Sequence, residues 1–126
     1  MKIRIYYEDT DHGGVVYHAN YLKFLERARS ERFFGAGLSP EVGNAHFVVS
    51  QINARFIAPA KFGDLIVISS DLMDVKNASF TLLQEIFLAE KKLFSATVTL
   101  AFVENGKPKR LDKSTKDLIV QMFGSN

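Results

Sequence analysis

A cluster of acidic residues lies near the start of the chain, in the stretch YYEDTDHGGVVYHANY at residues 6–21. Glu8, Asp9 and Asp11 fall within four positions, and two glycines and an apolar pair follow them. The apolar pair leads into a helical pattern, and the first turn of a helix offers free backbone N–H groups and a partial positive charge. A carbonyl placed there would have its developing oxyanion stabilised. The glycine bend could place a carboxylate close to the helix start. There it could attack that carbonyl or activate a water, which suits acyl transfer or hydrolysis.

The same stretch fits metal and nucleotide sites poorly. Read as a calcium loop, DTDHGG lacks the oxygen ligands required at its fifth and twelfth positions, which are Gly13 and Asn20. His12 and His18 do not have the i,i+4 spacing of a helical zinc site. The glycine pair lacks the Lys-Ser/Thr pair of a phosphate loop. We therefore expect no metal site, and a solvated turn remains the plain alternative for three acids and two glycines.

The composition is that of an ordinary globular protein. The chain has 126 residues, 47% of them apolar and 24% charged, with a net charge of +2. This balance argues against a broad nucleic-acid surface. With no cysteine, disulfides, thiolate catalysis and cysteine-based zinc sites are excluded. No window approaches the ~20 apolar residues of a membrane span or shows a secretory signal, so we expect one cytoplasmic domain over residues 1–126.

Hydrophobic periodicity predicts one long helix near the start of the chain. KIRIYY at residues 2–7 alternates and predicts a strand, and residues 8–18 predict a loop. From Asn20 to about Gly37 the apolar residues recur at helical spacing, and glycines followed by Pro40 supply stop signals. The apolar set of this helix is Tyr21, Leu22, Phe24, Leu25, Ala28, Phe33 and Phe34.

Four further strands are expected in hairpin order. Their ranges are residues 46–58, 64–75, 79–90 and 93–103. The last range alternates between an apolar face and a face of Ser and Thr. A short helix is expected from Leu111 to Phe123, capped by Asp112 or Ser114. This order predicts an α+β fold, in which a five-stranded antiparallel sheet covers one long helix. The outer face of the sheet must then be polar, covered or paired with another copy.

The pattern YYEDTDHGGVVYHANYLKFLERAR at residues 6–29, with FIAPAKFGD at residues 56–64, resembles the hot-dog-fold acyl-CoA thioesterases. It is most similar to the 4-hydroxybenzoyl-CoA thioesterase class and to the bacterial branch associated with the Tol-Pal cell-envelope system. The resemblance implies a hot-dog fold, with a sheet wrapped around the long helix and a short C-terminal helix. It also implies hydrolysis of an acyl-CoA to free acid and CoA without a cofactor. Hot-dog domains pair their sheets edge to edge, so a homodimer assembling to a homotetramer is implied as well.

The resemblance further implies a role for each residue of the first motif. Asp11 takes the position of the catalytic carboxylate, as nucleophile or as general base on water. The backbone N–H of His18 takes the position that polarises the thioester carbonyl, while Tyr7 and the His18 side chain are implied to orient substrate or water. The implied substrate contacts are Gly14, Val15, Val16 and Tyr17, although Tyr17 suits a plain core position equally well. His12 departs from the family pattern, where close relatives often carry a small residue.

Two alternatives remain at this point. Glu26 is a rival acid, but it lies ~12 Å along the helix axis from His18, too far from the helix start. We expect Glu26 to pair with Arg29 or with a partner chain, and Asp9 to form the turn. The alternative function is a non-catalytic module that binds acyl groups or an acyl carrier protein. An intact Asp11, which binding alone does not need, speaks against that alternative.

Overall fold

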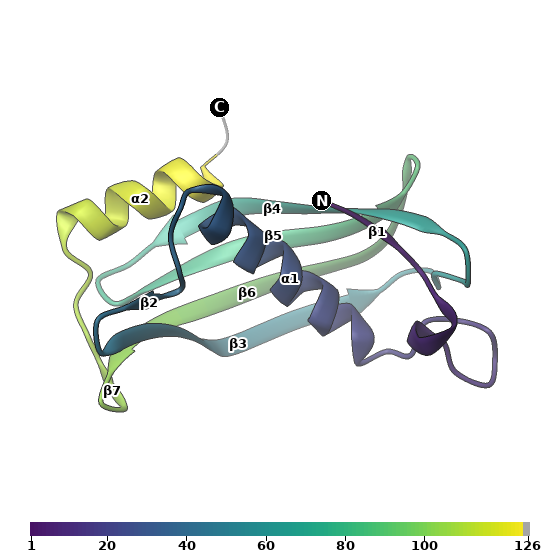
Figure 1. Ribbon diagram of the computed structural model, residues 1–126, viewed down its shortest axis with the longest axis horizontal. Coiled ribbons are helices and arrows are strands. Elements are labelled where there is room, and N and C mark those ends of the chain that lie inside the picture. The colour runs from purple at the N-terminus through teal and green to yellow at the C-terminus, as the bar shows by residue number, and fades with distance from the viewer. Residues whose placement is uncertain (125–126) are drawn as a thin grey trace.

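The computed structural model of the chain describes residues 1–124. Its elements in chain order are β1 (Lys2–Arg4), the 3₁₀ turn η1 (Tyr7–Asp9), α1 (Asn20–Gly35), β2 (Glu41–Val42), β3 (Ala45–Phe56), β4 (Leu65–Val75), β5 (Ser79–Leu88), β6 (Lys91–Glu104), β7 (Lys107–Pro108) and α2 (Lys113–Phe123). The strands form one antiparallel sheet in the order β1-β4-β5-β6-β3-β2, with β7 paired to β6. Helix α1 lies across one face of this sheet, and α2 lies beside β4 at one end (Figure 1). The predicted α+β architecture is confirmed.

The predicted element boundaries differ from the structure mainly at their ends. The strand expected at residues 2–7 stops at Arg4, because the Tyr6 N–H donates to the Asp9 carboxylate at 2.9 Å and starts the η1 turn. The strands β2 and β7, each of two residues, extend hairpins and were not predicted. The C-terminal helix begins at Lys113, and its cap is Asp112, whose carboxylate accepts the Thr115 N–H at 2.8 Å. The cap prediction of Asp112 is therefore confirmed, and Ser114 is not the cap.

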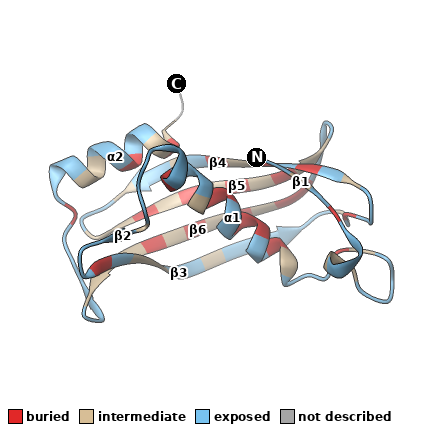
Figure 2. Cartoon of the chain, viewed as in Figure 1, coloured by how far each residue is buried: buried red, intermediate tan, exposed pale blue. Residues whose placement is uncertain are grey.

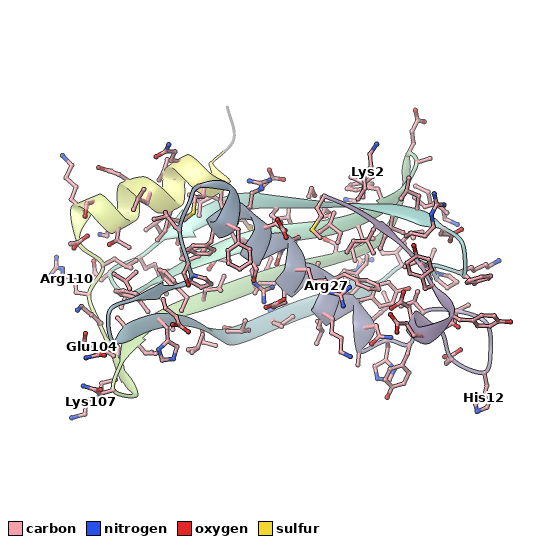
Figure 3. All side chains as sticks on the ribbon, viewed as in Figure 1. Lys2, His12, Arg27, Glu104, Lys107 and Arg110 are labelled. Atoms are coloured by element: carbon pink, nitrogen blue, oxygen red, sulfur yellow. The ribbon has the colours of Figure 1, made fainter. Side chains whose placement is uncertain are left out.

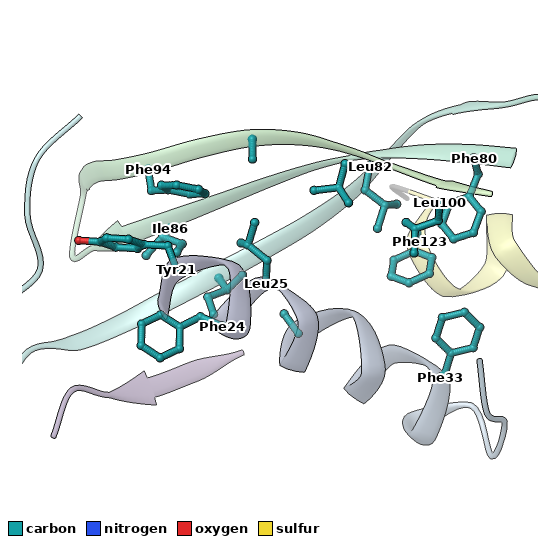
Figure 4. Close-up of a cluster of buried hydrophobic side chains, with 14 of the residues drawn as sticks. Tyr21, Phe24, Leu25, Phe33, Phe80, Leu82, Ile86, Phe94, Leu100 and Phe123 are labelled. Carbon is teal, nitrogen blue, oxygen red and sulfur yellow. The ribbon is translucent and has the colours of Figure 1, made fainter. Parts of the chain in front are cut away.

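The core fills the space between α1 and the sheet. The inward residues of β6 are Phe94, Ala96, Val98, Leu100 and Phe102, none more than 6% exposed. The intervening Ser and Thr residues face outward and are half-buried. Figure 2 shows the same alternation along the strands, and Figure 4 shows the aromatic and aliphatic side chains packed between α1 and the strands. The expected period-two pattern of this strand is confirmed.

Fewer apolar residues of α1 are buried than the sequence pattern predicted. The buried residues of the helix are Tyr21, Phe24, Leu25, Ala28, Arg29 and Phe33. Leu22 and Phe34 are 39% and 58% exposed, because 3.6 residues per turn rotates them away from the sheet. Arg29, a residue assigned to no apolar pattern, takes a buried place instead. Within residues 1–124, no helix is long and apolar enough to cross a membrane.

Candidate active site

The loop between η1 and α1 is a tight hairpin held by backbone hydrogen bonds. Asp11 N–H donates to the Val15 carbonyl at 2.9 Å, and Gly14 N–H donates to the Asp11 carbonyl at 3.1 Å. Gly14 has φ +78°, a left-handed conformation that favours glycine. Val16 N–H donates to the Ala60 carbonyl at 2.9 Å, which ties the hairpin to the segment after β3. The two glycines therefore form the bend that the sequence predicted.

Two carboxylates of this loop have different partners. Asp9 accepts the Tyr6 N–H, so the prediction that Asp9 forms the turn is confirmed. Asp11 Oδ1 accepts the Gly13 N–H at 2.8 Å. Among residues 1–124 no hydrogen bond is made to Asp11 Oδ2, and the side chain is exposed. Asp11 therefore keeps one oxygen that can accept a proton or attack an electrophile.

Helix α1 begins at Asn20, as predicted, and it has no side-chain cap. Its first residue is Asn20 and its cap is Ala19, so His18 lies in the turn before the helix. The Asp9 carbonyl accepts both Tyr17 N–H and Asn20 Nδ2, each at 3.0 Å, which holds this turn in place. In the described part of the chain the His18 N–H has no acceptor. An open N–H beside a helix start is suited to bind a carbonyl oxygen or an anion.

A cavity of about 310 Å³ lies beside His18. Its lining residues are Val16, His18, Tyr21, Phe56, Ile57, Ala58 and Pro59. The Tyr21 hydroxyl accepts the Ala60 N–H at 3.1 Å, and its ring stacks on Phe94 with centroids 5.1 Å apart. Burial raises the pKa of Tyr21 above its ordinary value, so this hydroxyl stays neutral. The cavity has mostly apolar walls, and His18, whose backbone N–H is unbonded, is one of its lining residues, an arrangement suited to an acyl group next to a polarised carbonyl.

The structure brings only two of the predicted site residues into this cavity. Val16 and His18 line it, whereas the other predicted residues, Tyr7, Asp11, Gly14, Val15 and Tyr17, do not. Tyr7 is 79% exposed and stacks on Phe62 at 4.7 Å. Tyr17 is 47% exposed and packs on the His18 ring, so the alternative of a plain core position was wrong. His12 lies at the outer tip of the loop (Figure 3).

Five of the cavity residues were absent from the predicted site. Tyr21 was expected only in the helix face. Phe56 is the last residue of β3, and Ile57, Ala58 and Pro59 follow it. The signal that could have found the latter four is the second segment of the resemblance, at residues 56–64. It runs beside the glycine hairpin through the Val15–Lys61 bridge, a contact that no local pattern reveals.

Of the two alternatives expected for Glu26, the ion pair with Arg29 is not formed, and a contact with a partner chain stays a prediction. Glu26 Oε1 accepts the Ser30 hydroxyl at 3.2 Å, and Arg29 donates instead to Gln84 Oε1 at 2.9 Å. The ion pairs within residues 1–124 are Lys92–Glu85 and Lys109–Glu104. Arg29 turns inward because its place on the helix faces the sheet, whereas Glu26 faces solvent.

Comparison with known proteins agrees with this geometry. The family model described as thioesterase superfamily matches residues 13–95. The Acyl-CoA thioesterase YbgC of Helicobacter pylori is 38% identical, covering 94% of this chain and 98% of the relative. The relative of the same name in Haemophilus influenzae is 40% identical, covering 86% and 83%. The crystal structure of a probable thioesterase from Bartonella henselae has a TM-score of 0.83 at 35% identity, covering 89% and 97%. The chain belongs to the thioesterase superfamily, with its hot-dog fold.

Proposed function

We propose that this protein hydrolyses an acyl-CoA to the free acid and CoA at the N-terminal end of α1. The relatives named as acyl-CoA thioesterases support the reaction class. The observation that carries the site is the open His18 N–H beside the 310 Å³ cavity. In this account the acyl group occupies the cavity, and the thioester carbonyl oxygen accepts the His18 N–H. The partial positive charge at the start of α1 adds to the polarisation.

Asp11 supplies the second half of the proposed reaction. As a general base, Asp11 takes a proton from water while the water oxygen bonds to the carbonyl carbon. As a nucleophile, Asp11 itself forms the new bond, giving an anhydride that water then hydrolyses. In both routes the C–S bond breaks and the thiolate of CoA leaves and is protonated. The His18 side chain and Tyr7 orient substrate or water, and Gly14, Val15, Val16 and Tyr17 contact the substrate.

A second copy of the chain is proposed to complete the site. Asp11 and Tyr7 lie on an exposed loop outside the cavity, so one chain does not enclose all the proposed groups. Beyond residue 46, β3 is an edge strand with no partner on its outer side in the described chain. Such an edge commonly pairs with another strand. We propose a homodimer joined through β3, assembling to a homotetramer.

The cellular setting follows from the resemblance alone. We propose a cytoplasmic enzyme of the Tol-Pal-associated branch that needs no cofactor, because the coenzyme A is part of the substrate. Acyl carrier protein is proposed as a second carrier of the acyl group. Release of carrier thiol from an acylated carrier protein, measured beside release from the matching acyl-CoA, tests that extension.

The proposed function is tested by free-thiol release from aliphatic, branched and aromatic acyl-CoAs offered to the purified protein. Turnover of at least one class is expected, with the preferred class set by the depth of the cavity. If no acyl-CoA is turned over but one binds saturably, the hydrolase is wrong and the acyl-binding module is right. If none binds, both are wrong.

A further inference from the structure

A second cavity lies between the middle of α1 and the strands β3 and β6. It measures about 190 Å³, and it is lined by Glu26, Arg29, Ser30, Phe33, Pro40, Phe47, Val49 and Leu100. None of these residues lines the cavity at His18. The walls contributed by Phe33, Phe47 and Leu100 are apolar, and the polar groups all come from one helix face. The volume is that of about six water molecules, so only a small molecule fits.

The buried charged group of this cavity is Arg29; Glu26, the other charged residue that lines it, is exposed and forms no ion pair with Arg29. Arg29 is 8% exposed, and one guanidinium nitrogen donates to Gln84 Oε1 at 2.9 Å. Gln84 is itself fixed, since its Nε2 donates to Ser70 Oγ at 2.9 Å and to the Leu25 carbonyl at 3.1 Å. Within residues 1–124 no carboxylate oxygen lies within 4.0 Å of Arg29. A buried cation that has only a neutral amide acceptor is costly until an anion joins it.

Arg29 has hydrogen-bond donors left over, and it is one of the residues that line the cavity. A guanidinium carries five N–H donors, and here one hydrogen bond is made. No side-chain nitrogen or oxygen in the described residues is both fully buried and without a partner. The unbonded nitrogens of Arg29 therefore keep some accessible surface, and Arg29 lines the cavity. Burial lowers the pKa of Arg29, and the nearby Glu26 opposes this, but an arginine of this kind stays charged at neutral pH.

We propose that this second cavity binds a short-chain monocarboxylate, whose carboxylate pairs with Arg29 and whose chain lies against Phe33 and Phe47. The planar fork of a guanidinium matches a carboxylate in a bidentate pair. Glu26 at the mouth disfavours a second negative charge, which selects a monoanion over a dicarboxylate. The site does not depend on the proposed hydrolysis, because it shares no residue with the first cavity.

The test is a calorimetric titration of the purified protein with butyrate, against sodium chloride at matched ionic strength. Saturable binding is expected for butyrate, and butyramide, which lacks the charge, is expected to bind at least about tenfold more weakly. Arg29→Met is expected to weaken butyrate binding by at least about tenfold, and Glu26→Gln to strengthen it. Glu31→Gln, an exposed residue of the same helix outside the cavity, is the matched control and is expected to change nothing.

Ser30→Leu tests the same cavity if Arg29→Met fails to fold. This substitution adds an apolar side chain at the cavity wall without touching Gln84, and it is expected to weaken butyrate binding. No saturable binding, equal binding of butyramide, or unchanged binding in Ser30→Leu would each overturn the proposal. Weaker binding in Glu26→Gln would also overturn it, because it would mean that Glu26 assists the ligand.

Discussion

The two ends of helix α1 are built in opposite ways. At its C-terminal end, Leu38 N–H donates to the Phe33 carbonyl at 2.8 Å and Gly37 N–H to the Phe34 carbonyl at 2.9 Å. Gly37 has φ +73°, so this end is closed by a Schellman motif. At the N-terminal end, Ala19 offers no side-chain cap and the His18 N–H has no acceptor in the described chain. The C-terminal end of the helix is closed by backbone hydrogen bonds, whereas the turn at the N-terminal end has an N–H donor left for a ligand.

The packing around the two ends of α1 also differs: it is close and aromatic at the C-terminal end and more open at the N-terminal end. The ring of Phe33 lies 6.0 Å from that of Phe47 and 5.9 Å from that of Phe123. Figure 4 shows Phe33 and Phe123 at one end of the core and Tyr21 beside Phe94 at the other. Around the N-terminal end, Phe56 and Ile57 are half-exposed and border the cavity. Stability should therefore be concentrated at the C-terminal end and reactivity at the N-terminal end.

Phe33→Ala should give the largest loss of stability. Truncating this buried ring removes its apolar contacts and leaves a cavity, at a cost of about 3–5 kcal/mol in the free energy of unfolding. Urea unfolding measures that loss, and acyl-CoA turnover per folded molecule should stay near the wild-type value. Phe34→Ala, at a position 58% exposed, is the control and should cost less than about 0.5 kcal/mol. Equal losses in the two variants would contradict the division between the two ends.

Tyr21→Phe should give a smaller loss of stability at the open end. The substitution keeps the stacked ring but leaves the buried Ala60 N–H without its acceptor, which costs about 1–3 kcal/mol. Chemical denaturation measures the effect. Tyr17→Phe is the matched control, because the Tyr17 hydroxyl makes no hydrogen bond within residues 1–124 and the residue is half-exposed. A loss in Tyr21→Phe no greater than in Tyr17→Phe would show that the Ala60 bond does not stabilise this wall of the cavity.

Asp112→Asn should give the smallest effect, visible only as a change in pH dependence. The Thr115 backbone N–H lowers the pKa of Asp112, so the ionised form stabilises the start of α2. That stability is present above the unfolded pKa of about 3.9 and is lost as pH falls through the lower folded pKa. The melting temperature of the wild type should therefore fall more steeply in acid than that of Asp112→Asn, whose side-chain oxygen accepts without titrating. If the melting temperatures of the wild type and of Asp112→Asn fall equally steeply in acid, the ionised Asp112 side chain does not stabilise the start of α2.

Much of the fold could be predicted because its signals are local. The helix expected from Asn20 to about Gly37 runs to Gly35, and the alternation in 93–103 places its apolar residues inward. Burial of Arg29 could not be predicted, because its partner Gln84 lies on β5, far along the chain from α1, and no pattern assigns a cation to the core. The early stop of β1 was missed because it depends on one side-chain bond, from Tyr6 to Asp9.

The candidate site was less predictable than the fold. The glycine bend and the helix start could be read from adjacent residues, and they position His18 two residues before α1. The cavity wall at residues 56–59 comes from a distant segment, brought beside the loop by the hydrogen bond from Val16 to Ala60. Asp11 and Tyr7 lie outside that cavity, and neither spacing nor periodicity specifies where a substrate would lie relative to them.

The turnover number of Asp11→Asn on the preferred acyl-CoA tests the central claim most directly. Asparagine keeps the oxygen that accepts the Gly13 N–H, so folding should be unchanged, while the group that attacks or activates water is lost. Turnover should fall at least about a hundredfold, and Glu8→Gln, an exposed neighbour, should retain wild-type turnover. A folded Asp11→Asn protein with wild-type turnover would contradict the assignment of Asp11 and move the chemistry elsewhere in the molecule.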